Sequence, residues 1–86
     1  MHTVDLLEQA LDAAKVLGYR VRQEWLGGSG GGGCEIKGQK WLFLDLALSP
    51  ADQLAQVTDA LRADPRATHL NMHPALRSFL NLRKAA

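Results

Sequence analysis

Apolar residues recur every three to four positions near the start of the chain, which predicts an amphipathic helix from about Thr3 to Leu17. Leu7 and Leu11 belong to the apolar stripe of this helix. We expect the hydroxyl of Thr3 to cap the first turn. Gly18 stands where a helix commonly ends in a left-handed residue, so we expect the helix to stop there.

The pattern then changes to alternation, which predicts three strands. The first strand covers Tyr19–Leu26, the second Cys34–Lys37 and the third Lys40–Leu48. A glycine-rich loop at 27–33 is expected to join the first two strands as a hairpin, and Gly38-Gln39 to form a tight turn between the last two. Because such links pair strands that are consecutive in the chain, we expect an antiparallel three-stranded sheet.

The third strand is apolar on both of its faces. Trp41 and Phe43 point one way, and the leucines of the strand point the other: Leu42, Leu44, Leu46 and Leu48. A strand of this kind is usually covered on both faces. The helices of so short a chain can cover one face, so we expect the face with Trp41 and Phe43 to be left for a partner.

The second half of the chain reads as helical. Ser49-Pro50 opens a helix that ends at Asp64-Pro65, and Pro74 starts a last helix. The stretch Ala67–Met72 is a candidate for a short fourth strand. The predicted fold is a single α+β domain over residues 1–86, a small two-layer sandwich with the helices on one face of the sheet. Its order is helix, strand, strand, strand, helix, optional strand, helix.

Composition agrees with an ordinary globular domain, with 47% hydrophobic and 22% charged residues among 86. A formal net charge of +1 provides no bulk attraction to nucleic acid or to a membrane, so neither is an expected partner. The single cysteine excludes an internal disulfide. The longest apolar run, Trp41–Leu44, is far too short to span a bilayer, and Met1–Asp5 lacks the basic region of a signal peptide. We therefore expect a cytoplasmic protein.

The glycine tract matches the dinucleotide pattern G-x-G-x-x-G only formally. That pattern requires a helix directly after the glycines, whereas Cys34–Lys37 reads as a strand, and no Lys-Ser/Thr pair completes a P-loop. We therefore expect no nucleotide cofactor. Two interpretations stay open: a plain hairpin tip, which we favour, and a nest of backbone N–H groups for a small anion. The residues of that candidate anion site are Gly28, Ser29, Gly30 and Gly31.

Cys34 and a histidine-containing segment are the candidates for chemistry. Cys34 with His69, Asn71 and His73 would make a nucleophilic set or a soft metal site if the fold brought them together. The simpler interpretation makes Cys34 a small inward-facing residue and leaves the histidines solvated. We adopt it, and we assign no catalytic residue and no metal ligand.

Asp45 is an acid among the apolar residues of the third strand. A carboxylate there must be paired or exposed, and the favoured interpretation is a cross-strand ion pair with Arg20 or Arg22. The alternative is a binding carboxylate with a raised pKa beside the glycine loop.

The order of elements from Asp5 to Leu61 resembles the helix–three strands–helix layout of toxin RNases of the HicA type, which have a double-stranded-RNA-binding-like fold. The resemblance is carried by Leu17-Gly18-Tyr19 and by the Gly-Ser step at Ser29. Those toxins place a catalytic histidine after Gly-Ser, but here Gly30 follows, and no histidine lies between His2 and His69. No catalytic residue carries over, so the resemblance is one of topology alone.

Taken together, these features predict a non-enzymatic interaction module that associates with itself, as a homodimer, or with another protein. The apolar sheet face with Trp41 and Phe43 is the expected contact surface. The alternative is a small-ligand or catalytic protein built on the glycine loop, Cys34 and the segment His69–His73.

Overall fold

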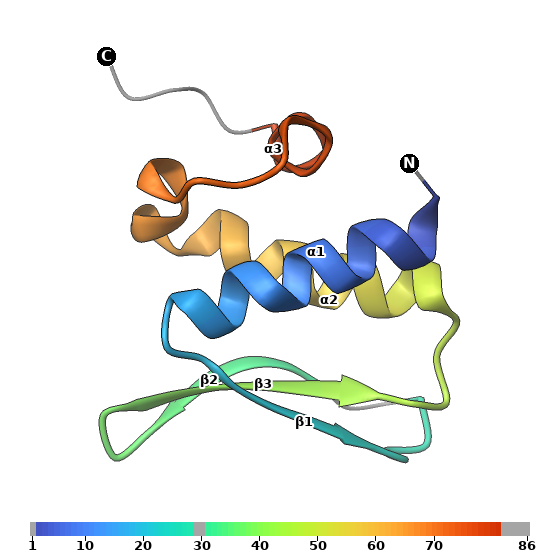
Figure 1. Ribbon diagram of the computed structural model, residues 1–86. Coiled ribbons are helices and arrows are strands. Elements are labelled where there is room, and N and C mark those ends of the chain that lie inside the picture. The colour runs from blue at the N-terminus through green and yellow to red at the C-terminus, as the bar shows by residue number, and fades with distance from the viewer. Residues whose placement is uncertain (1, 29–30, 82–86) are drawn as a thin grey trace.

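The computed structural model describes residues 2–28 and 31–81 and confirms the α+β class (Figure 1). Within that part of the chain a sheet lies against helices that are gathered on one of its faces. The elements in chain order are α1 (Thr3–Val16), β1 (Arg20–Glu24), β2 (Gly32–Ile36), β3 (Gln39–Asp45), α2 (Pro50–Ala63), the 3-10 helix η1 (Pro65–His69) and α3 (Pro74–Leu80).

The sheet is mixed, so the prediction of an antiparallel sheet was wrong. Its strand order is β1-β3-β2; β3 runs parallel to β1 and antiparallel to β2. The segment between β1 and β2 is therefore not a hairpin loop, because β3 separates the two strands. The strand with two apolar faces takes the centre, and the charged and glycine-rich strands take the edges, where less of each strand has to be buried.

The second predicted hairpin, between β2 and β3, is confirmed. Its two turn residues are Lys37 and Gly38, one position earlier than predicted, with φ angles of 50° and 78°. Positive φ at both central positions is the mark of a type I′ turn, whose twist matches that of the flanking strands. Ile36 and Gln39 pair directly next to this turn.

The core lies between the sheet and the pair of helices α1 and α2. Leu42 and Leu44 of β3 are fully buried and join apolar residues of both helices in one cluster, which continues to Leu76 and Leu80 of α3. Figure 1 shows α3 on the side of the helices that faces away from the sheet. Among residues 2–28 and 31–81, no helix covers the other face of the sheet. None of the helices described here is long and apolar enough to cross a membrane.

Helix ends follow the sequence in most places. Ser49 caps α2, since its hydroxyl accepts a hydrogen bond from the backbone N–H of Asp52. Thr3 does not cap α1; it is already helical, and His2 occupies the cap position without a side-chain bond. The stretch Ala67–Met72, proposed as a fourth strand, instead begins within the 3-10 helix η1. This helix forms because the side chain of Asp64 accepts the N–H of Arg66 and Pro65 suits a helical first position.

Candidate functional site

The carboxylate of Asp45 organises the end of the sheet where β1 and β3 finish. Its oxygens accept hydrogen bonds from the backbone N–H groups of Leu26 at 3.0 Å, Gly28 at 2.5 Å and Ala47 at 2.9 Å. The residue is completely buried. The predicted ion pair with Arg20 or Arg22 is absent from the described structure, where Arg22 instead pairs with Glu24.

These hydrogen bonds explain how the chain passes from β1 to β2. The link must cross the end of β3 because β3 lies between those two strands. Adjacent strands are about 4.8 Å apart, so the link spans roughly twice that distance. Leu26 and Gly28 belong to the link, and Asp45 ends β3. A backbone N–H group of the glycine loop thus binds an anionic group, as the anion-site hypothesis requires, but that group is the side chain of Asp45 and not a separate ligand.

The alternative interpretation predicted a raised pKa for Asp45, but the pKa is lowered. Burial acts to raise the pKa of its carboxyl group, but the backbone N–H groups of Ala47, Leu26 and Gly28 together hold the pKa below its usual value. Asp45 therefore remains charged in the folded protein to lower pH than an ordinary aspartate.

We expect Asp45→Asn to destabilise the fold, because the asparagine would present an NH2 group where backbone donors need an acceptor. The melting temperature at neutral pH should fall by roughly 5–15 °C. Since the folded pKa is depressed, the stabilisation by Asp45 is present above the ordinary value of 3.8 and is lost as the pH falls below it. Thermal unfolding monitored by circular dichroism from neutral to acidic pH measures both effects. Asp12→Asn, at an exposed position on α1, is the control; equal melting temperatures for the two variants would contradict the role of Asp45.

Several glycines of the tract have backbone conformations or close contacts in which any other residue would be strained. Gly28 and Gly31 have positive φ angles of 79° and 111°. A Cβ on Gly31 would lie 2.6 Å from the side-chain nitrogen of Gln56 and 2.9 Å from the carbonyl oxygen of Phe43. Of the candidate anion-binding residues, Ser29 and Gly30 lie outside the described residues, and the N–H of Gly28 donates to Asp45.

Gly31→Ala should destabilise the protein more than Gly32→Ala. Both positions have positive φ, 111° and 107°, so both variants carry backbone strain, but only the Cβ at position 31 meets other atoms. We expect the difference in free energy of unfolding to be about 1–3 kcal/mol, the usual range for overpacking. Urea denaturation of the two variants measures it. A Gly32→Ala variant at least as damaged as Gly31→Ala would show that the close approach of α2 is unimportant.

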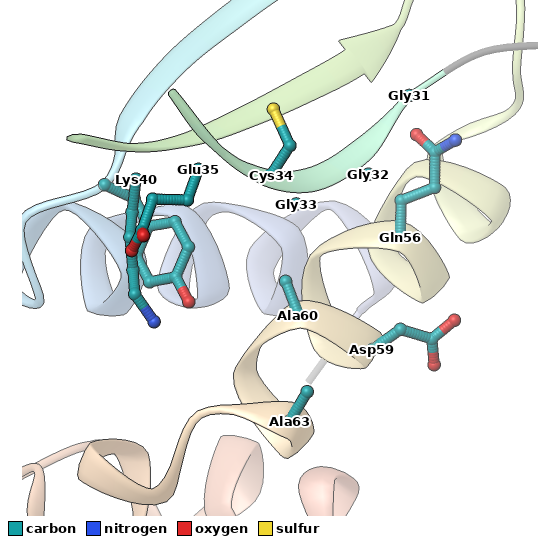
Figure 2. A pocket seen from close by; sticks show the side chains of 11 residues that line it. Gly31, Gly32, Gly33, Cys34, Glu35, Lys40, Gln56, Asp59, Ala60 and Ala63 are labelled. Carbon is teal, nitrogen blue, oxygen red and sulfur yellow. The ribbon is translucent and has the colours of Figure 1, made fainter. Parts of the chain in front are cut away.

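A groove of about 620 Å³ lies between the edge strand β2 and helix α2 (Figure 2). Gly31, Gly32 and Gly33 form one wall without side chains, and Ala60 on α2 lies opposite Gly33. A Cβ on Gly33 would come within 3.2 Å of that of Ala60, so small residues let the helix approach the strand closely. In Figure 2 the thiol of Cys34 points away from α2. The prediction that Cys34 faces inward was wrong, since it is exposed.

One end of the groove carries a polar cluster around Asp64. This nearly fully buried carboxylate accepts hydrogen bonds from the hydroxyl of Tyr19 at 3.0 Å and from the guanidinium of Arg66 at 2.7 Å, with the ammonium of Lys40 at 3.5 Å. Hydrogen bonds from Arg66 are the main reason that the pKa of Asp64 lies well below its usual value, against the effect of burial. Burial, followed by the carboxylate of Asp64, raises the pKa of Tyr19.

Sequence reasoning missed this cluster. It assigned Asp64 only the role of ending a helix. Arg66 is two positions from Asp64, but Tyr19 is 45 positions away. The cluster ties β3 and the residue before β1 to the end of α2. Because each group already has a partner, the cluster is structural.

The fold does not assemble Cys34 with the histidine segment. Cys34 is on β2, whereas residues 69–73 lie beyond the helical layer from the sheet (Figure 1). His73 caps α3, where its Nδ1 accepts the N–H of Ala75 at 3.0 Å. Within residues 2–28 and 31–81, no group of three or more His, Cys, Asp or Glu side chains is placed to hold a metal ion.

The other side of the sheet is the remaining candidate. We call it the open face, the surface turned away from α1 and α2. Trp41 and Phe43 of the central strand lie there, with ring centroids 5.8 Å apart and planes 14° from parallel, and neither ring belongs to the core cluster. The guanidinium of Arg20 lies 5.7 Å from the centre of the Trp41 ring. By the pairing register, the open face comprises Arg20, Arg22 and Glu24 of β1, Trp41 and Phe43 of β3, and Gly32, Cys34 and Ile36 of β2.

Comparison with other proteins does not identify the chain. No protein-family model matches it, and neither does any curated protein or solved structure. The function must therefore be argued from the surfaces themselves.

Proposed function

We propose that the protein is an interaction module that associates with a second copy of itself through the open face. The observation that carries this proposal is the pair of stacked rings, Trp41 and Phe43, on the side of the sheet that no described helix covers. Both rings are only half-buried. Aromatic side chains remove large apolar areas from water when a partner packs on them.

The surroundings of the rings suit a protein partner. Ile36 on the neighbouring strand is 47% exposed, and Cys34 beside it is exposed as well. Arg20, over Trp41, adds a cation that can remain stacked on the ring when water is excluded. Aromatic residues and arginine are enriched among the residues that contribute most to protein interfaces.

The charges of β1 favour a second copy as the partner. Along the open face this strand presents Arg20, then Arg22, then Glu24. A two-fold axis that runs across the strands reverses the order in the second copy, so that its Glu24 faces Arg22 and its Arg22 faces Glu24. The charged strand is then complementary to itself. Arg22 and Glu24, which form an ion pair within each chain, can exchange partners across the interface. The near-neutral net charge of +1 does not favour a nucleic acid on the same surface.

Trp41→Ala should weaken self-association by about tenfold or more, the effect expected for a central aromatic residue of an interface. Sedimentation velocity over a concentration series measures this as a shift to smaller species at each concentration. Phe79→Ala is the matched control, because Phe79 is 43% exposed on α3, on the opposite side of the molecule. It should leave the sedimentation unchanged.

Two results would overturn the proposal. One is a wild-type chain that stays monomeric at high micromolar concentration. The other is a Trp41→Ala variant that folds normally by circular dichroism and sediments like the wild type. If the wild-type chain stayed monomeric and bound single-stranded oligonucleotides, and Trp41→Ala abolished that binding, the open face would be a stacking platform for bases instead.

A further inference from the structure

Strand β2 forms one edge of the sheet and is suited to pair with another strand. It is bonded to β3 on one side, and no described residue pairs with its other side. In an antiparallel pair, residues alternate between those that exchange hydrogen bonds and those whose backbone groups point outward. Because Ile36 flanks a two-residue turn, it bonds to β3, and so do Cys34 and Gly32. The backbone groups of Gly33 and Glu35 therefore point to the free edge.

The side chains along this edge are unevenly distributed. Residues 31–33 are glycines, whereas Glu35 and Lys37 follow at the other end. Natural edge strands are usually blocked by proline, by inward charges or by a covering element. Within the described residues β2 has no proline, and no strand or helix lies along its free edge. Its one charged side chain, Glu35, lines the groove against α2, which the glycine half of β2 also borders (Figure 2).

We infer that β2 is a second self-association site, at which two copies pair their β2 strands in antiparallel orientation about a two-fold axis through Cys34. This register places Gly33 of each copy opposite Glu35 of the other, so the symmetry creates two equivalent pairs. Each pair exchanges two backbone hydrogen bonds, and the two sheets become one continuous sheet. The inference concerns a different surface from the open face and does not depend on it.

Shape is the argument for a second copy rather than an unrelated strand. The half of β2 that carries side chains lies against the half that has none. The side chain of each Glu35 lies opposite Gly33 of the other copy, which has no side chain of its own to meet it, and Ala60 of α2, which packs over Gly33, is small. A register that paired Glu35 with Glu35 of the other copy would place two like charges opposite each other, and the inferred register avoids this.

Charge agrees with this register. Lys37, the first residue of the turn after β2, lies beyond the last paired residue, at the end of the paired strands where Gly31 of the other copy precedes β2. Gly31 lies at the end of the groove that is bordered by α2, where Asp59 is exposed and its only described partner is Arg62 on its own helix, at 3.3 Å. The ammonium of Lys37 from the second copy therefore lies at the end of the paired strands where Asp59 of α2 is exposed, and the symmetry repeats this placement at the other end.

The chain's only cysteine provides the test. In the inferred register the two Cys34 residues form a non-hydrogen-bonded pair, with Cα atoms about 4.5 Å apart. A disulfide requires a Cα separation of roughly 4.4–6.8 Å, whereas sheets packed face to face are about 10 Å apart. Diamide, which accepts two electrons and two protons from two thiols, should therefore convert the chain into a covalent dimer if the edges pair. The experiment is best done with Trp41→Ala, in which the open face has been weakened.

Glu35→Pro should abolish the edge pairing without breaking β2 from β3. Proline removes an outward N–H that the bonds to β3 do not use, and the symmetric pair loses two hydrogen bonds. We expect the rate of dimer formation with diamide to fall about tenfold. Glu35→Ala is the matched control, since it removes the carboxylate but keeps the N–H, and it should cross-link nearly as fast as the parent chain. Circular dichroism checks that each variant is folded.

The outcomes separate this inference from the proposed function. Cross-linking that persists in Trp41→Ala and disappears in Glu35→Pro supports the edge pairing, whatever the open face does. If the folded Glu35→Pro variant cross-links as fast as Glu35→Ala, or if neither variant nor parent cross-links, the edge pairing is refuted. In that case a Trp41-dependent sedimentation change would still support association through the open face.

Discussion

The sheet depends on a carboxylate at the point where the chain has to cross its own central strand. In the sequence, the link from β1 to β2 precedes β3, yet in the sheet β3 lies between those two strands. Asp45, the last residue of β3, holds the link through the N–H groups of Leu26 and Gly28. It also bonds to Ala47, where the chain turns toward α2. A single side chain thus accepts hydrogen bonds from backbone donors of two loops and joins both loops to the end of β3.

This arrangement determines what the protein can offer to a partner. Because β3 is central, its leucines take the face that α1 and α2 cover, and its aromatic residues take the face that they do not. The glycines of β2 have no side chains to fill the space beside α2, so a groove and not a packed boundary lies at that edge. The surfaces available for association are therefore a consequence of the strand order, not of the overall charge.

The polar groups that attract attention in the sequence have mostly structural roles. His73 caps a helix, Asp45 holds a loop, and Asp64 joins Tyr19 and Arg66 into a satisfied cluster. Each of these side chains already has its hydrogen bonds within the chain. Among the described residues, a pair of half-buried rings and a strand edge open to solvent are left for a partner, which is why we argue for association rather than for chemistry.

Local sequence patterns determined the helices and the β2–β3 turn. The apolar stripe of α1, the Ser49-Pro50 start of α2 and the glycine in the turn act within one or two turns of chain, and neighbouring residues suffice to specify them. The placement of Trp41 and Phe43 on the opposite face from Leu42 and Leu44 was also predictable, because side chains alternate between the two faces of a strand.

Only the tertiary structure decided which strands are neighbours. A strand's own pattern does not reveal its partner, and β1 was assigned to β2 because they are consecutive in the chain. The distant partners of Asp45 and Asp64 could not be predicted for the same reason: Gly28 and Tyr19 come close to these carboxylates only in the folded chain. Their other partners, Ala47 and Arg66, are local. The burial of β3 in the middle of the sheet, which removes its two apolar faces from water more completely than an edge position would, is the physical reason for that order.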